Sequence, residues 1–136
     1  MKHYPHPEGI NLDNLLKMAD YIETVPQHRF DMKSYRYWDE SEPECSSVGC
    51  IIGHCTILDN EDLPRLWSGK IDFNEWSEKF IGTKEYSAWR YLFGGEWEHI
   101  DNTPEGAAKR IRYYVANGLP ENWFEQMDGE EPLSYL

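Results

Sequence analysis

The chain has 136 residues and a formal net charge of −12, from 25 acidic and 13 basic side chains. This length predicts a single domain. The charge argues against direct binding to DNA, RNA or anionic lipid, because like charges repel. No run approaches the roughly 18 apolar residues that a membrane-spanning helix needs.

Residues 1–7 contain no apolar run, which predicts that they are not a secretory signal. The three cysteines are then expected to be reduced in a cytoplasmic protein. Six Trp, nine Tyr and five Phe can bury a large apolar area. We therefore expect a compact domain with an aromatic-rich core.

Residues 1–9 are predicted to form a flexible, extended arm, because Pro5, Pro7 and Gly9 interrupt regular structure. A helix should follow, capped by Asn11 and ending near residue 25, just before a proline. Its apolar residues recur at helical spacing and predict one buried stripe: Leu12, Leu15, Leu16, Ala19 and Ile22.

The aromatic residues between 29 and 38 are compatible with a short β-hairpin or an irregular loop. A second helix is predicted over residues 47–58, with Ser46 or Ser47 as its cap. Its glycines, Gly49 and Gly53, suggest close packing at the centre of the domain. Residues 61–67 are expected to form a short helical turn.

Three further helices have clear start and stop signals. Asp72 and Glu75 form the pattern of a capping box, and Gly82 ends that helix. Thr83 is predicted to cap the next helix, which Gly94 stops. The last helix begins at residues 103–105 and ends at residues 117–118, and its bases Lys109, Arg110 and Arg112 favour its second half. Residues 125–136 should form an acidic tail. The fold class is therefore all-α, a single compact bundle of about five helices.

The most distinctive run of the sequence covers residues 45–54, in which Cys-x4-Cys-[Ile/Leu/Val]-x-Gly is formed by Cys45, Cys50, Ile51 and Gly53. It resembles a motif of small, uncharacterised phage and bacterial proteins, and the likeness extends loosely over residues 10–125. It departs at Ser46 and Ser47, where glycine and threonine are usual, and at His54, where an aromatic or small residue is commoner. The resemblance implies a phage or mobile-element origin and a location in the host cytosol. It implies no activity and no catalytic residue.

Two interpretations use the cysteines of this run. Cys45 precedes the predicted second helix, whose dipole would lower the pKa of its thiol. His28, His54 or His99 could act as its base. The sheet that carries the histidine of cysteine peptidases has no counterpart in the pattern. Alternatively, Cys45, Cys50 and His54 could bind a structural zinc ion, although no second close cysteine pair follows. A small, buried, inert cysteine is the simplest interpretation.

The acidic residues gather in clusters beside aromatic side chains, an arrangement suited to an interface with a basic protein. Such acids would otherwise serve solubility alone. The predicted partner-binding residues are Trp38, Asp39, Glu40, Glu42, Glu44, Asp59, Glu61, Asp62, Glu96, Glu98 and Asp101.

The sequence therefore predicts a non-enzymatic, acidic protein-binding module. The phage resemblance refines this to an inhibitor of the anti-CRISPR or anti-restriction type, which would occupy a basic nucleic-acid-binding surface on a host defence protein. The expected partner is a host protein with a basic surface, with no direct nucleic acid, no membrane and no cofactor. The alternatives are a cysteine-dependent enzyme using Cys45 with a histidine, and a small zinc-binding domain.

Overall fold

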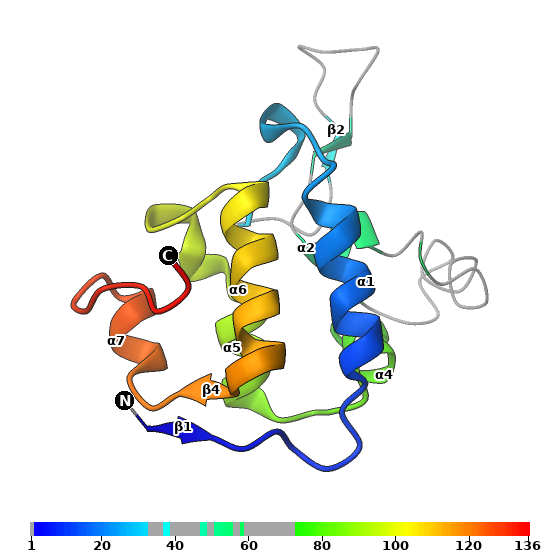
Figure 1. Ribbon diagram of the computed structural model, residues 1–136. Helices are drawn as coiled ribbons and strands as arrows, with labels where there is room; N and C mark the ends of the chain where they lie inside the picture. Colours follow the sequence, from blue (N-terminus) through cyan, green and yellow to red (C-terminus); the bar gives the residue numbers. More distant parts are fainter. Residues whose placement is uncertain (1, 33–36, 39–46, 49–50, 56–57, 59–72) are drawn as a thin grey trace.

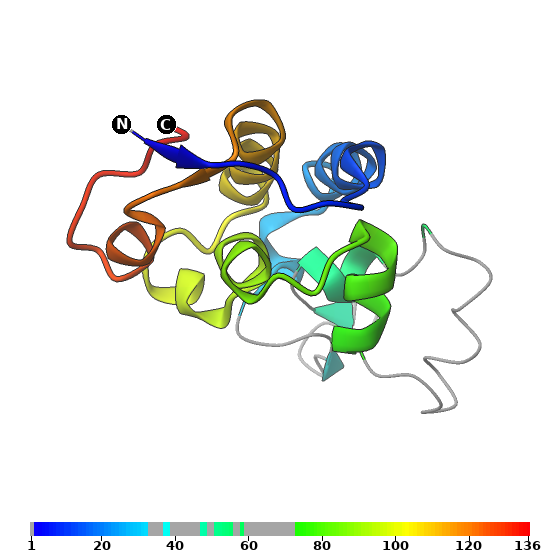
Figure 2. The same cartoon turned by 90° about the horizontal axis from the view of Figure 1, so that it is seen from below.

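The computed structural model describes residues 2–32, 37–38, 47–48, 51–55, 58 and 73–136. Its helices form two layers (Figure 1, Figure 2). One layer holds α1 (Leu12–Ile22) and α6 (Pro104–Asn117), which pack side by side. The other holds α4 (Phe73–Ile81), α5 (Tyr86–Phe93) and α7 (Trp123–Met127). The predicted all-α, single-domain class is therefore confirmed.

The shorter elements connect these layers. They are η1 (Gln27–Arg29), α2 (Ile51–Cys55), η3 (Gly95–His99) and four two-residue strands. Strand β1 (His3–Tyr4) pairs antiparallel with β4 (Leu119–Pro120), which joins the two ends of the chain. Strand β2 (Tyr37–Trp38) pairs antiparallel with β3 (Ser47–Val48). A hairpin was expected between residues 29 and 38, and of these β2 holds Tyr37 and Trp38, while residues 33–36 lie outside the described ranges.

Helix α1 begins as predicted, because the Asn11 side-chain oxygen accepts a hydrogen bond from the Asn14 amide at 2.9 Å. Its buried stripe differs in one position from the prediction. Leu16 is exposed, and Met18 takes the core position instead. The helix ends at Ile22 rather than near Val25, because the backbone bonds of Thr24 and Val25 reach back only three residues, to Tyr21 and Ile22.

The second helix was predicted over residues 47–58, and this start is wrong. Ser47 and Val48 are paired as strand β3, and the described part of the helix begins at Ile51. Pairing with β2 satisfies these backbone groups outside a helix, so Ser47 cannot act as a helix cap.

The remaining helices follow their end signals. Gly82 has a φ of +80° just after α4, and Gly118 has a φ of +88° just after α6, conformations that favour glycine. Thr103 caps α6, accepting from the Gly106 amide at 3.0 Å, with Pro104 in the first turn. Helix α5 starts later than expected, because Glu85 rather than Thr83 stands at its N-cap position. Asp72 and the 61–67 turn lie outside the described residues.

The core is rich in aromatic side chains, as predicted. Trp76, Trp97, Tyr91 and Tyr114 are at most 1% exposed. Arg112 ties α6 to α1 at the surface through ion pairs with Asp20 and Glu23, at 2.9 and 2.8 Å. None of the helices within the described ranges is long and apolar enough to cross a membrane.

Candidate functional site

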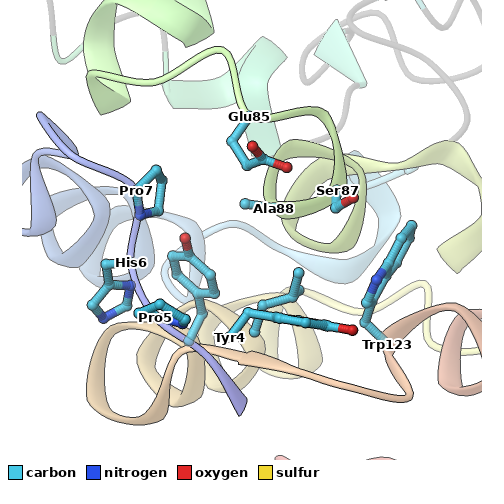
Figure 3. A pocket seen from close by; sticks show the side chains of 10 residues that line it. Tyr4, Pro5, His6, Pro7, Glu85, Ser87, Ala88 and Trp123 are labelled. Atoms are coloured by element: carbon cyan, nitrogen blue, oxygen red, sulfur yellow. The ribbon is translucent and has the colours of Figure 1, made fainter.

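A pocket of about 420 Å³ lies where the N-terminal arm crosses the second half of α6 (Figure 3). Its walls come from the arm, the start of α5, the end of α6, strand β4 and the start of α7. Its volume lies within the range of small-molecule sites. Its lining residues are Tyr4, Pro5, His6, Pro7, Glu85, Ser87, Ala88, Tyr114, Leu119 and Trp123.

The arm that forms one wall is held by contacts at several points. Its His3–Tyr4 strand pairs with β4, and the His3 Nε2 atom hydrogen-bonds to the Tyr113 hydroxyl at 2.6 Å. The His6 ring bonds to the Val115 carbonyl at 3.0 Å. An added Cβ on Gly118 would overlap the Tyr4 carbonyl oxygen, so this glycine permits the close approach of arm and helix. These contacts give the pocket a preformed wall.

Two buried polar atoms beside the pocket have no hydrogen-bond partner, the Tyr114 hydroxyl and the His6 Nδ1. Because a carbonyl only accepts, the His6 Nε2 must donate to Val115, which leaves Nδ1 as an acceptor in the neutral ring. Burial raises the pKa of Tyr114 to about 12, and the nearby Glu85 carboxylate adds to the rise. Buried polar groups without partners are uncommon and call for an explanation.

Among the described residues, Glu85 alone brings a carboxylate to the lining. It occupies the N-cap position of α5, but its side chain makes no capping hydrogen bond. Figure 3 shows Glu85 and Ser87 on one side of the pocket and the Tyr4 ring on the other, with Trp123 at one end. Among the residues that the structure describes, no Lys or Arg lines the pocket. The site therefore combines aromatic walls with a negative charge.

A second unusual group, Arg110, is fully buried one turn earlier on α6. Its guanidinium carbon lies 4.1 Å from the centre of the Trp97 ring, and Nη1 donates to the Tyr135 hydroxyl at 3.3 Å. That hydroxyl donates to Asp101 at 2.7 Å. Burial lowers the pKa of Arg110. The sequence predicted Arg110 as a base favouring the helix C-terminus, whereas it lies in the core beneath the C-terminal segment.

Three of the predicted partner-binding acids are described. Glu96 accepts from Arg90 Nε at 2.8 Å, and Glu98 lies 3.8 Å from the His99 ring. Asp101 is half-buried and accepts from Thr103 as well as Tyr135, so its carboxylate supports the fold. The structure describes the backbone of Trp38 in β2. The other predicted residues lie outside the described ranges: Asp39, Glu40, Glu42, Glu44, Asp59, Glu61 and Asp62.

A further acidic surface lies in and after α7. After Arg112 the sequence has no Lys or Arg, and it has five acids, which we call the C-terminal acids: Glu121, Glu125, Asp128, Glu130 and Glu131. The pKa of Glu130 is raised, first by its hydrogen bond to the Asp128 carboxyl and then by the charges of its acidic neighbours. The raised pKa is consistent with crowding of Glu130 by Asp128, Glu125 and Glu131.

The described residues supply few of the groups that the predicted cysteine chemistry requires. His54 Nε2 bonds to the backbone carbonyl of Arg29, which ties α2 to η1. Cys55 is fully buried, with its thiol 3.7 Å from the Met18 carbonyl. Cys45 and Cys50 lie outside the described ranges. Within those ranges no group of three His, Cys, Asp or Glu side chains could hold a metal ion.

Sequence reasoning did not identify the pocket residues. Its lining comes from segments around residues 4–7, 85–88, 114–119 and 123, and no spacing rule joins them. The alternation Pro5-His6-Pro7 was the available signal, because prolines hold an extended backbone that can lie along a helix. No family model, curated protein sequence or solved structure matches this chain. The argument for function therefore depends on the geometry of its own surfaces.

Proposed function

We propose that this chain is a non-enzymatic, acidic protein-binding module whose partner presents a basic surface. The proposal draws first on the net charge of −12. A surplus of this size steers encounter with cationic proteins and disfavours anionic ones. Its finer form, an inhibitor that covers the nucleic-acid-binding groove of a host defence protein, draws on the phage resemblance of residues 45–54.

The observation that carries the proposal is the crowding of the C-terminal acids. Asp128, Glu125 and Glu131 all raise the pKa of Glu130, so the carboxylates repel one another in the isolated chain. A partner bearing Lys or Arg side chains would relieve that repulsion on binding. Solubility alone does not explain the cluster, because the same charges would keep the chain soluble equally well if they were spread over its surface.

An exposed aromatic side chain accompanies these acids. Phe124, in α7 between Glu121 and Glu125, is 45% exposed, and the Arg90 guanidinium lies 5.1 Å from its ring centre. Aromatic residues that are surrounded by charged side chains commonly anchor protein interfaces. Phe124 therefore offers the apolar contact, and the acids around it offer orientation.

The test starts with the chain immobilised and exposed to a bacterial lysate, followed by elution with a salt gradient. We expect retention of a basic, nucleic-acid-binding protein that elutes as ionic strength screens the charges. Duplex DNA should compete for the retained protein. Failure to retain any cationic protein at low ionic strength, or retention insensitive to salt, would contradict the proposal.

Two charge-neutralised variants locate the surface on the purified partner. One replaces four C-terminal acids (E125Q, D128N, E130Q and E131Q), and the other replaces the predicted loop acids (D39N, E40Q, E42Q and E44Q). Exposed ion pairs contribute about 0.2–1 kcal/mol each, so the responsible set should weaken binding roughly tenfold and flatten its salt dependence. A control with the same charge change elsewhere (E8Q, D13N, E78Q and E105Q) should bind nearly as the unmodified chain does. Equal loss in all three variants would mean that net charge alone acts.

A further inference from the structure

The pocket beside the N-terminal arm has a consistent polarity. The Glu85 carboxylate and the neutral His6 Nδ1 can only accept hydrogen bonds, and the Tyr114 and Ser87 hydroxyls can both accept and donate. Neither the His6 Nδ1 nor the Tyr114 hydroxyl has a partner in the chain. Both atoms are buried, so a ligand group that donates hydrogen bonds would first meet the Glu85 carboxylate and the Ser87 hydroxyl.

The charge of the pocket is also one-sided. The Glu85 carboxylate forms no ion pair with the part of the chain that the structure describes, and its side chain does not cap α5. The aromatic rings of Tyr4, Tyr114 and Trp123 add the negative faces of their π-systems, which attract cations. An anionic ligand would meet a carboxylate and no base, so the lining disfavours it.

The shape adds a third constraint. Pro5, Pro7, Ala88 and Leu119 supply apolar wall, and the pocket is open to solvent on one side. A volume of about 420 Å³ accommodates an alkyl chain with a polar head rather than a bare ion. A metal ion would find one carboxylate and one imidazole among the lining residues, too few ligands to fill its coordination shell.

We infer that this pocket binds a primary alkylammonium group, with its charge beside Glu85, its stem against the prolines and its flank against Trp123 and Tyr4. The N–H donors of such a group match the Glu85 carboxylate and the Ser87 hydroxyl, which both accept hydrogen bonds. Two sources share this chemistry, a free amine and the side chain of a lysine on a partner protein. The inference stands apart from the proposed function, because the C-terminal acids do not line the pocket.

The first experiment titrates n-butylammonium chloride into the ¹⁵N-labelled full chain and follows its NMR spectrum. We expect saturable shifts of the Tyr4, Glu85 and Ser87 amides and the Trp123 indole, with a dissociation constant on the order of 1 mM for so small a ligand. 1-Butanol has the same stem without the charge, and butyrate has the opposite charge. Both should bind at least about tenfold more weakly.

A matched pair of variants assigns the charge. Glu85→Gln should weaken n-butylammonium binding by roughly tenfold or more, because it removes a charge-assisted hydrogen bond. Glu105→Gln makes the same charge change in the first turn of α6, outside the pocket, and should leave the constant within about twofold. Trp123→Leu should weaken binding several-fold through lost cation–π attraction, about 0.5–1 kcal/mol at an exposed site. The unfolding midpoint of each variant checks that it remains folded.

A capped tripeptide, acetyl-Gly-Lys-Gly-amide, distinguishes the two sources. Binding at least as tight as that of n-butylammonium indicates a lysine side chain, and exclusion of the tripeptide indicates a free amine. The inference is overturned if no saturable shift appears at concentrations about ten times the expected constant. It is equally overturned if 1-butanol binds as well, or if Glu85→Gln has no effect. None of these outcomes depends on the C-terminal acids, so this test and that of the proposed function fail separately.

Discussion

Two successive turns of α6 each carry a buried polar side chain, and the surroundings of these two side chains differ. At Arg110 the C-terminal segment closes over the helix, and Trp97, Tyr135 and, through Tyr135, Asp101 accommodate the guanidinium. At Tyr114 the N-terminal arm crosses the helix but leaves a pocket, and the hydroxyl has no partner. Both side chains are at most 1% exposed.

The difference teaches that burial alone does not separate structural from functional polar groups. Arg110 has an aromatic face from Trp97 and a hydroxyl partner for its Nη1 atom within the chain, whereas its Nε and Nη2 atoms have no partner among the described residues. Tyr114 lies beside a preformed cavity whose polar atoms lack partners, and a ligand would account for it. The predictions below compare the surroundings of these two side chains, which we call the Arg110 end and the Tyr114 end of α6.

The largest effect is expected for the tryptophans that serve the two ends. Trp97 is fully buried beneath Arg110, and Trp97→Ala should lower the free energy of unfolding by about 3–5 kcal/mol. Trp123 is half-buried on the pocket wall, and Trp123→Ala should cost only about 1–2 kcal/mol. Urea denaturation followed by circular dichroism measures both. Equal losses would show that the pocket wall is as essential to the fold as the core.

The glycines at the two ends form the next pair. Gly118→Ala forces a strained φ and overlaps the Tyr4 carbonyl, so we expect a loss of about 2 kcal/mol and faster amide exchange in β1 and β4. Gly106→Ala overlaps the Asp101 carboxylate instead, and its better helix propensity, about 1 kcal/mol, offsets part of the cost. In Gly106→Ala, amide exchange should become faster near Tyr135 and not in the N-terminal arm. The same exchange pattern in both variants would argue against independent ends.

Removing single hydroxyls compares the ends directly. Tyr135→Phe deletes the group that bridges Arg110 and Asp101, and should cost about 1–3 kcal/mol. Tyr114→Phe deletes a buried hydroxyl with no partner, and should leave the stability unchanged or slightly raised. Urea midpoints for the two variants, at neutral pH, give the comparison. A marked loss in Tyr114→Phe would mean that the hydroxyl has a partner within the fold.

The contribution of Tyr114 to the free energy of unfolding should depend on pH in the alkaline range. Its pKa is raised to about 12 from an ordinary value of 10.0, because burial favours the neutral phenol. The stability that this group contributes is therefore complete below pH 10 and is lost as pH rises towards 12, by at most about 1.4 kcal/mol per pH unit. Urea titrations between pH 9 and 12 should show a shallower decline in Tyr114→Phe. An unchanged slope would contradict the shift.

The smallest effect concerns the C-terminal acids, in the segment that leads to the Arg110 end. The pKa of Glu130 is raised by its hydrogen bond to Asp128 and by the charges of its acidic neighbours, so its charged form is less favourable in the folded chain than in the unfolded chain. Glu130→Gln should therefore raise the thermal midpoint slightly. Glu105→Gln, in the first turn of α6, should lower it slightly, because a carboxylate there favours the helix dipole. A lower midpoint for Glu130→Gln would indicate that the acids do not repel.

Where signals are local, the sequence predicted the structure well. Asn11 caps α1, and Thr103 with Pro104 starts α6, because a cap needs only the backbone of its own first turn. Gly82 and Gly118 end their helices because few other residues adopt a positive φ. The abundance of aromatic side chains predicted their place in the core, since burying them drives folding.

Tertiary structure decided everything that depends on which segments meet. Strand pairing took Ser47 and Val48 out of a predicted helix, and packing against the C-terminal segment buried Arg110, which helical spacing had assigned to the dipole. The pocket at Tyr114 exists only because residues from both ends of the chain and from α5 converge there. Caps and periodicity act over four or five residues, whereas a cavity is set by contacts more than a hundred residues apart, such as that between His6 and Val115.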